Sequence, residues 1–296
     1  MTTTSWDATT GELRFETKLI AGTLRADGER VAITELTYRP TGKRVDSGMM
    51  FAPYRLLARS AWMGEAREMA HRATPISDGV EVVWAPTITH QAELRLRIAF
   101  AEPGTVDCQV EVTGHGYYPD YEVFLSAYFA AGFRPGAWLT PVRGRGTAPE
   151  LVRPVANPIF REMYVAFPRD ERAARIIADG RWQRGRHHTR FLPARYHGLP
   201  MGFYAQYDGP LDVLLMGLPE DVFAVSMAYA TDDPTDDVGQ HNSLYVSLFG
   251  RDLHPGDRWR TSTRLVFGDF DRDEDRHREQ YEAFHTSAVR GTMAWD

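Results

Sequence analysis

The stretch that decides the fold is residues 243–267, which read SLYVSLFGRDLHPGDRWRTSTRLVF. Apolar and polar residues alternate on both sides of a turn at Pro255-Gly256-Asp257. The positions that share one face are Leu244, Val246 and Leu248 before the turn and Thr261, Thr263, Leu265 and Phe267 after it. A period of two residues is the signal of half-buried antiparallel strands. The stretch therefore predicts a hairpin of two strands near the C-terminus.

Strand patterns also dominate the rest of the chain. Tight-turn dipeptides separate short alternating segments, at Asp27-Gly28, Asp78-Gly79, Pro103-Gly104 and Asp208-Gly209. Further strands are expected at 122–129, 202–207, 211–218 and 222–229. Many antiparallel strands without strand–helix–strand alternation predict an all-β sandwich or barrel. We expect a single domain over residues 1–296.

One helix is predicted, at about 273–288. His277, Tyr281, Phe284 and Ala288 fall on one of its faces, and charged residues occupy the others. That spacing is typical of an amphipathic helix. We expect this helix to pack on the exterior of the sandwich.

Composition and charge limit the classes of binding partner and the cellular compartment that can be expected. The 296 residues carry a formal net charge of −6, which gives no electrostatic reason to expect nucleic acid or an anionic membrane as a partner. The first residues lack a basic region and an apolar core, and no apolar run approaches the roughly 20 residues that span a bilayer. With Cys108 as the single cysteine, an intrachain disulfide is excluded. We expect a soluble cytoplasmic protein, either a monomer or a homodimer.

Three segments resemble the galactose mutarotase-like (aldose 1-epimerase-like) family. The first is the predicted hairpin with its Leu253-x-Pro255-Gly256-Asp257-x-Trp259 run, and the others are residues 48–57 and 125–133. The resemblance implies an antiparallel β-supersandwich that binds a sugar on a concave sheet. It implies that Arg55 contacts the sugar and that Tyr128 belongs to the site.

The family's catalytic positions are altered in this chain. Tyr54 replaces the asparagine before the sugar-binding arginine, and Ser126 and Ala127 stand at the positions of an Asn-His pair. Near the place of the family's glutamate base the chain reads Gln240-His241-Asn242. Opening a sugar ring needs a positioned acid and a positioned base. A standard aldose 1-epimerase reaction is therefore not expected.

Other polar and aromatic residues are candidates for the chemistry. Residues 114–122 contain His115 and Tyr118, where rings can stack on sugar faces and histidine can transfer protons. The alternative is a loop whose tyrosines cover a sheet edge. In the second cluster, residues 182–198, the candidates are Trp182, His188, Arg190, Arg195 and His197. Its arginines would grip hydroxyls or a carboxylate, and the alternative is a solvated basic loop.

Residues 232–242 form an acidic loop that ends in His241 and Asn242. Its aspartates lack the regular spacing of an EF-hand, so a solvated loop is the alternative to a calcium site. His241 and Asn242 precede the predicted hairpin, where the resemblance places sugar-facing residues. No cofactor is expected; a divalent metal held by His197, His241 or a distant carboxylate remains an alternative.

These observations predict a carbohydrate-active protein with a small-molecule carbohydrate as its partner. The first hypothesis is an isomerase, lyase or hydrolase that uses His197, His241 or His115 as acid or base. Arg55, Tyr118, Tyr128, Trp182, His188, Arg190, Arg195 and Asn242 would bind its substrate. The second hypothesis is a non-catalytic sugar-binding or regulatory protein on the same fold. The third is an enzyme for another small molecule, because a fold does not fix a function.

Overall fold

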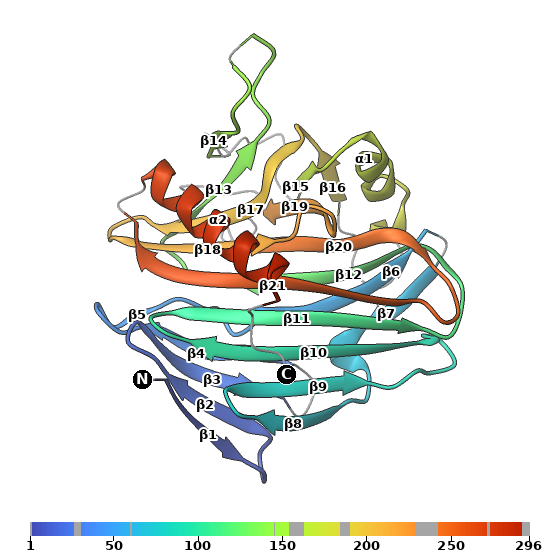
Figure 1. The fold of residues 1–296 in the computed structure, drawn as a ribbon, viewed down its shortest axis with the longest axis horizontal. Helices are drawn as coiled ribbons and strands as arrows, with labels where there is room; N and C mark the ends of the chain where they lie inside the picture. The colour runs from blue at the N-terminus through green and yellow to red at the C-terminus, as the bar shows by residue number, and fades with distance from the viewer. Residues whose placement is uncertain are drawn as a thin grey trace.

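The computed structural model describes residues 2–26, 31–59, 61–144, 146–153, 163–183, 190–228, 242–270 and 273–291. Its strands form three sheets. The N-terminal sheet has the order β1-β2-β3-β4-β5. These strands are β1 (Thr3–Asp7), β2 (Glu12–Glu16), β3 (Ile20–Arg25), β4 (Ala32–Tyr38) and β5 (Lys43–Arg44). Figure 1 shows this sheet beside β8 and β9, and Phe15 stacks on Phe100 with ring centroids 3.8 Å apart.

The nine-stranded sheet has the order β14-β13-β17-β18-β21-β11-β10-β9-β8. Its first members in the chain are β8 (Arg72–Ile76), β9 (Gly79–Trp84), β10 (Ala92–Ala101), β11 (Thr105–Gly114) and β13 (Phe133–Leu139). The others are β14 (Glu150–Val152), β17 (His197–Gln206), β18 (Leu211–Gly217) and β21 (Arg258–Asp269). The predicted turns at Asp78-Gly79, Pro103-Gly104 and Asp208-Gly209 each join two antiparallel neighbours of this sheet.

The seven-stranded sheet has the order β16-β15-β19-β20-β12-β6-β7. It contains β6 (Ala52–Ala58), β7 (Ala61–Glu65), β12 (Tyr118–Tyr128), β15 (Met163–Pro168), β16 (Arg190–Pro193), β19 (Val222–Ala228) and β20 (Ser243–Leu253). Short helices flank it: η1 (Ala66–Glu68), α1 (Glu171–Ile177) and η3 (Arg181–Gln183). The all-β class with an antiparallel sandwich is confirmed.

The two strands of residues 243–267 are confirmed, but their pairing as a hairpin is wrong. β20 pairs with β12 and β19 in the seven-stranded sheet, whereas β21 pairs with β11 and β18 in the nine-stranded sheet. The turn at Pro255-Gly256-Asp257 therefore carries the chain from one sheet to the other. The alternation of apolar and polar residues shows that one face of each strand is buried. It does not show which other strand each one pairs with.

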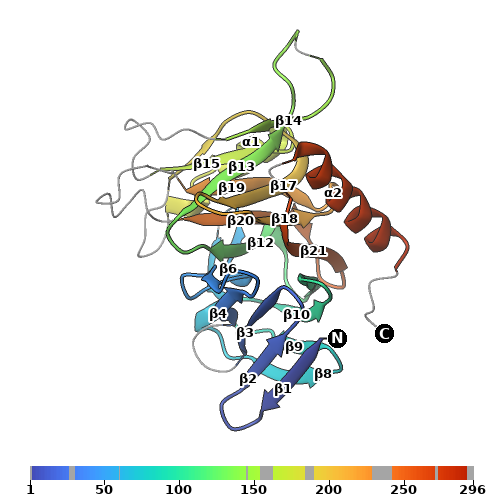
Figure 2. The same ribbon diagram turned by 90° about the vertical axis from the view of Figure 1, so that its left-hand side faces the viewer.

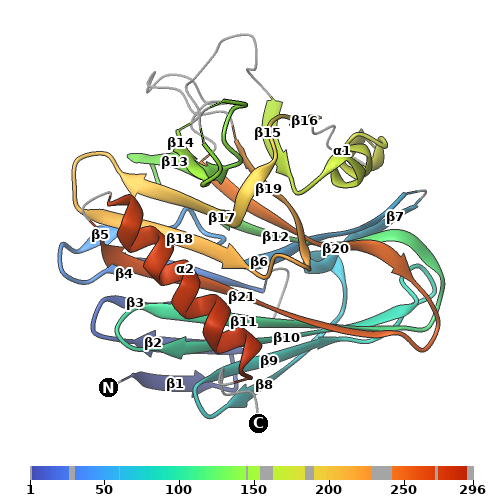
Figure 3. The same ribbon diagram turned by 45° about the horizontal axis from the view of Figure 1, so that its top comes forward.

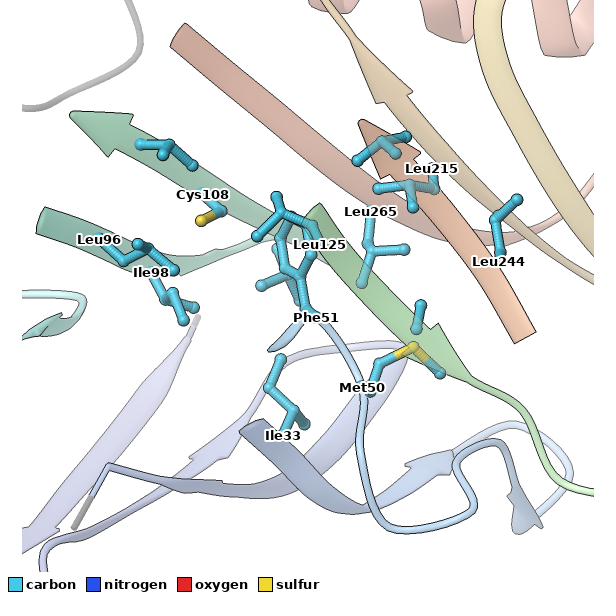
Figure 4. Packing of buried hydrophobic residues seen from close by; sticks show 14 of the residues in the cluster. Ile33, Met50, Phe51, Leu96, Ile98, Cys108, Leu125, Leu215, Leu244 and Leu265 are labelled. Carbon is cyan, nitrogen blue, oxygen red and sulfur yellow. The ribbon is translucent and has the colours of Figure 1, made fainter. Parts of the chain in front are cut away.

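The core lies between the sheets. Side chains from both inner faces, including Cys108, Leu125, Leu215, Leu244 and Leu265, are fully buried there (Figure 4). Ile33 and Met50 connect this core to the N-terminal sheet through two backbone hydrogen bonds of 2.8 and 2.9 Å. Because successive side chains of a strand point to opposite faces, residues that alternate with these core positions lie on the outer faces.

The predicted C-terminal helix is confirmed as α2 (Glu274–Val289). It lies across the outer face of the nine-stranded sheet (Figures 1 and 3), and in Figure 2 it is the outermost layer beyond β17 and β18. His277, Tyr281 and Phe284 are buried against that sheet, as the helical spacing predicted. His277 Nε2 lies 3.1 Å from a carboxylate oxygen of Asp212. Within the described ranges, no helix is long and apolar enough to cross a lipid bilayer.

Candidate functional site

Aromatic side chains gather on the outer face of the seven-stranded sheet. The strand alternation that sends Val123, Leu125 and Ala127 into the core sends Phe124 and Tyr128 to this opposite face. We call the set the aromatic face: Tyr54, Phe124, Tyr128, Tyr164, Trp182, Phe191 and Tyr245. Four of its members, Tyr54, Tyr128, Tyr164 and Phe191, are only partly buried.

Arg55 is the charged residue at the centre of this face. In the pairing of β6 with β12, Arg55 stands opposite Phe124 and Pro53 opposite Leu125, so Tyr54 is an extra residue. A bulge of this kind re-aims side chains, and here Tyr54 and Arg55 both reach the aromatic face. The Arg55 guanidinium carbon lies 4.8 Å from the ring centroid of Tyr54 and 4.9 Å from that of Trp182.

A carboxylate accompanies Arg55. Glu65, at the end of β7, places one oxygen 3.9 Å from Arg55 Nη2 and forms an ion pair with Arg67. Arg55 Nη2 also donates to the Tyr54 hydroxyl at 3.3 Å. Arg55 is fully buried and Glu65 nearly so. A buried charge needs such partners, because desolvation without them is costly.

Three tyrosines supply hydroxyl groups beside the guanidinium. The Tyr245 hydroxyl donates to that of Tyr128 at 3.3 Å, and the rings of Tyr164 and Tyr245 lie 5.7 Å apart. Burial raises the pKa of Tyr128, Tyr164 and Tyr245 above the usual value for tyrosine. These phenols therefore stay protonated at neutral pH and act as hydrogen-bond donors or acceptors.

A buried ion-pair network holds Trp182 in place. Its neighbour Arg181 donates from Nη1 to Glu122 at 2.9 Å and to the Asp120 carbonyl at 2.9 Å, and from Nη2 to Asp179 at 2.9 Å. The Arg181 side chain is wholly buried and Glu122 almost so. The network fixes η3 against β12, so that the Trp182 ring packs edge-on against Phe124 at 4.3 Å.

Three of the residues predicted from the sequence come together here: Arg55, Tyr128 and Trp182. Arg190 begins β16 next to Phe191, with an exposed side chain. Asn242 lies just before β20 and donates from Nδ2 to the Ala130 carbonyl at 3.2 Å. His188 and His241 lie outside the described residues, and their roles stay predictions.

The other predicted residues lie elsewhere. Arg195 contacts Glu150 and the Thr140 carbonyl, beside β13 and β14. The Tyr118 hydroxyl accepts from the Gln91 amide at 2.7 Å, and Tyr118 packs against the inter-sheet core. His115 is exposed in the connection between β11 and β12. No interaction described for these residues involves a member of the aromatic face, and their site roles stay predictions.

His197 begins β17 in the nine-stranded sheet, and its ring is buried. Burial is the main reason that its pKa falls to about 4; the nearby Arg169 guanidinium lowers it further, and a hydrogen bond with the Val222 backbone opposes the shift. Its surroundings are therefore Val222, Arg169 and Asp170 rather than Arg55. A catalytic role for His197 stays a prediction.

The low pKa of His197 predicts a dependence of stability on pH. In the unfolded chain the His197 ring takes up a proton near pH 6.5, whereas in the folded chain it takes one up only near pH 4. The contribution of His197 to the free energy of unfolding is therefore fully present above pH 6.5. It decreases as the pH falls from 6.5 to about 4, by at most about 1.4 kcal/mol per pH unit. In urea unfolding from pH 7 to 4.5, His197→Leu should flatten this decline. An unchanged slope in that variant would contradict the assignment, and His254→Leu, at an exposed position between β20 and β21, is the control.

The alignment with the family motif needs one correction. Ala127 cannot stand at the position of the family's histidine on the site face, because its side chain lies in the inter-sheet core. Ser126 is the residue between Phe124 and Tyr128 on the outer side of β12, and its hydroxyl lies 3.4 Å from the Ala52 carbonyl. The two-residue period of the strand decides between them.

Glu65, Tyr164, Tyr245 and Phe191 were not singled out from the sequence. The signal for Tyr245 was present, because a residue between Leu244 and Val246 must face away from the core. Glu65 and Tyr164 belong to strands that reach the site only through the sheet order. Among the described residues, no group of three or more histidine, cysteine, aspartate or glutamate side chains is arranged to hold a metal ion.

No protein-family model and no curated protein matches the sequence. Solved structures do match. The galactosidase domain of the α-galactosidase–sucrose kinase AgaSK superposes with a TM-score of 0.54 at 10% identity, over 90% of this chain and 42% of that one. A proposed aldose 1-epimerase from Escherichia coli K12 gives 0.53 at 12% identity, over 91% of this chain and 100% of that one. The fold is that of the galactose mutarotase-like proteins.

A third match is the α-N-acetylgalactosaminidase NagBb from Bifidobacterium bifidum, in complex with GalNAc. It gives a TM-score of 0.52 at 14% identity, over 98% of this chain and 38% of that one. The chain thus spans less than half of the galactosidase and galactosaminidase chains that it matches. At these identities the comparison concerns the fold alone.

Proposed function

We propose that this protein binds a carbohydrate on the aromatic face, and that the buried Arg55 becomes the central hydrogen-bond donor when the rings of Tyr54 and Trp182 that cover it shift to admit the sugar. The observation that carries the proposal is the position of the Arg55 guanidinium between the rings of Tyr54 and Trp182, at 4.8 and 4.9 Å. Aromatic rings pack on the apolar C–H faces of sugars, and a guanidinium donates to several ring hydroxyls at once. Binding sites of this kind combine apolar walls with a few placed polar groups.

Two further features support a sugar as the ligand. The tyrosine hydroxyls of Tyr128, Tyr164 and Tyr245 stay protonated and can exchange hydrogen bonds with hydroxyl groups. The matching structures named above include a galactosidase domain, a proposed aldose 1-epimerase and a galactosaminidase, and each of these names refers to a carbohydrate substrate. Fold-level likeness raises the expectation of a sugar ligand without fixing which sugar.

A panel of neutral monosaccharides and disaccharides tests the proposal by thermal shift, because a ligand that binds only the folded state raises its stability. At a concentration 100 times the dissociation constant, the gain is about 2.7 kcal/mol. The proposal expects a saturable rise in the unfolding temperature with at least one sugar. Trp182→Ala should lose that rise. A Trp6→Ala variant, on the N-terminal sheet, is the control and should keep it.

Glu65 supports a second candidate function, acid–base chemistry on the bound sugar. Its carboxylate lies on the same side as the tyrosine phenols and is flanked by Arg55 and Arg67. A carboxylate base and a protonated phenol are a workable pair for proton transfer. Glu65→Gln should then abolish turnover while leaving the dissociation constant of the sugar nearly unchanged. A site that binds the sugar without catalysis would show no turnover in the wild type or in Glu65→Gln.

The site should not catalyse the interconversion of glucose or galactose anomers. Ser126 and Ala127 lack a group that titrates near neutral pH, and a positioned acid or base typically contributes 10²- to 10⁴-fold. Polarimetry on freshly dissolved α-glucose and α-galactose should give the rate of the buffer alone. Acceleration that disappears in Glu65→Gln would assign the reaction to Glu65 and contradict this expectation.

A further inference from the structure

A pocket of about 410 Å³ opens beyond the other end of β6 and β12, against α1. Its lining consists of Arg59, Asp120, Arg172, Arg175, Ile176 and Asp179. None of these residues belongs to the aromatic face. The volume lies within the roughly 300–1,000 Å³ of small-molecule sites. The pocket is therefore large enough for a ligand of its own.

The lining of this pocket carries more arginine than carboxylate side chains. Three guanidinium groups face two carboxylates, and Asp179 is already held by the buried Arg181 through bonds of 2.9–3.2 Å. Asp120 accepts from Arg59 and, at 2.8 Å, from Arg172. Arginine donors thus occupy both lining carboxylates, and Arg175 keeps its guanidinium open to solvent beside the exposed Glu171.

The arginines keep donors for a ligand. Arg172 uses Nη2 for Asp120, and Arg175 uses Nη1 for the exposed Glu171 at 2.9 Å. Arg59 uses Nε and Nη2 for Asp120. Each guanidinium carries five N–H groups in a planar fork that suits carboxylate and phosphate oxygens. The side chains of Arg59, Arg172 and Arg175 are 60, 53 and 68% exposed, so these forks are accessible.

The backbone at Asp120 is shaped to present its carboxylate to the two arginines. Asp120 has a φ of +47°, in the left-handed region that non-glycine residues rarely adopt. The register of β12 against β20 shifts on both sides of Tyr121. Asp252 accepts from the Asp120 amide at 3.0 Å, and the Asp120 carbonyl accepts from Arg181 at 2.9 Å, which holds this conformation. Strained residues held in this way are found preferentially at ligand sites.

We propose that this pocket binds an oxyanion, the carboxylate or phosphate group of an acidic small molecule. Arg172 and Arg175 on α1 contact the oxyanion from one side and Arg59 from the other. Asp120 is a positioning residue that orients Arg59 and Arg172. This inference goes beyond the sugar-binding proposal and does not depend on it, because the two sites share no residue.

Isothermal titration of the whole chain with inorganic phosphate, glucose 6-phosphate and glucuronate tests the proposal, with glucose as the uncharged reference. At least one anion should bind saturably, and more weakly as salt rises. Arg172→Gln and Arg175→Gln should each raise its dissociation constant about 10-fold, the effect of losing one charge-assisted hydrogen bond. Arg14→Gln, an exposed arginine on β2, should leave it unchanged. Preference for the two phosphates or for glucuronate identifies the oxyanion.

Two results would overturn the proposal. One is the absence of saturable binding for all three anions at low salt. The other is binding whose dissociation constant is the same in Arg175→Gln as in the wild type. Arg175 is the deciding variant if Arg172→Gln fails to fold, because its only described ion pair, with Glu171, is exposed. The second result would mean that the arginines of α1 have only a structural role at the end of the sheet.

Discussion

Arg181→Ala should lower the free energy of unfolding by about 3–5 kcal/mol, the usual cost of removing one partner of a buried ion pair. The variant leaves the buried Glu122 carboxylate without its guanidinium partner and removes the donor to the Asp120 carbonyl. Desolvation already raises the pKa of Glu122 even with Arg181 in place. Since a domain is stable by only about 5–15 kcal/mol in total, urea unfolding should register a large shift.

The matched controls for Arg181 separate burial from charge. Arg175→Ala removes a guanidinium whose ion pair is 68 and 78% exposed, and it should change stability by less than about 0.5 kcal/mol. Replacing both fully buried partners, Arg181→Met with Glu122→Leu, should recover part of the loss, because the charge of Glu122 is removed and Asp179, which also loses Arg181, is 16% exposed. A loss below about 1 kcal/mol in Arg181→Ala would contradict the claim that this network fixes η3.

Arg55→Met should raise the dissociation constant of the bound sugar about 10- to 100-fold, since hydrogen bonds from a charged donor contribute about 1.5–3 kcal/mol. Methionine keeps the apolar stem between Tyr54 and Trp182 while removing the donors. Because Arg55 is fully buried beside Glu65, the variant should also lose stability, so binding must be measured well below its unfolding temperature.

Arg39→Met is the control for Arg55, because Arg39 forms an exposed ion pair with Glu16 on the N-terminal sheet. Circular dichroism should show the Arg55→Met variant to be folded at the temperature of the titration. A folded Arg55→Met protein with the sugar affinity of the wild type would exclude Arg55 from the site.

Local sequence patterns predicted strands and the C-terminal helix of this fold. They could not predict which strands pair, because pairing depends on residues far apart in the chain. The alternation of Leu244 and Val246 with Tyr245 gives a strand and its buried face. It cannot say that β20 and β21 belong to different sheets, because both inner faces bury the same kind of side chain. The helix was accurate to a residue at each end, since its apolar spacing and the capping Asp273 are both local signals.

The site could be predicted only in part for the same reason. The family resemblance predicted Arg55 and Tyr128 as site residues. Trp182 was predicted from the unusual composition of the sequence around it. The bulge that turns Tyr54 and Arg55 to one face depends on the partner strand β12, which the sequence of β6 does not contain. Glu65 and Tyr164 enter the site because β7 and β15 take particular positions in the sheet order. His197 was a catalytic candidate because of the residues around it in sequence, while its hydrogen bond with the backbone of Val222 comes from a strand of another sheet.

The indole N–H resonance of Trp182 offers the most direct test that a sugar binds on the aromatic face. In a ¹H–¹⁵N spectrum the signal can be assigned by its loss in Trp182→Phe and followed while a sugar that raises the unfolding temperature is added. Sugar binding on this face predicts a saturable shift of the Trp182 signal with the dissociation constant of the thermal measurement, while the signal of Trp6 stays in place. A sugar that binds saturably and leaves the Trp182 signal unmoved would contradict it.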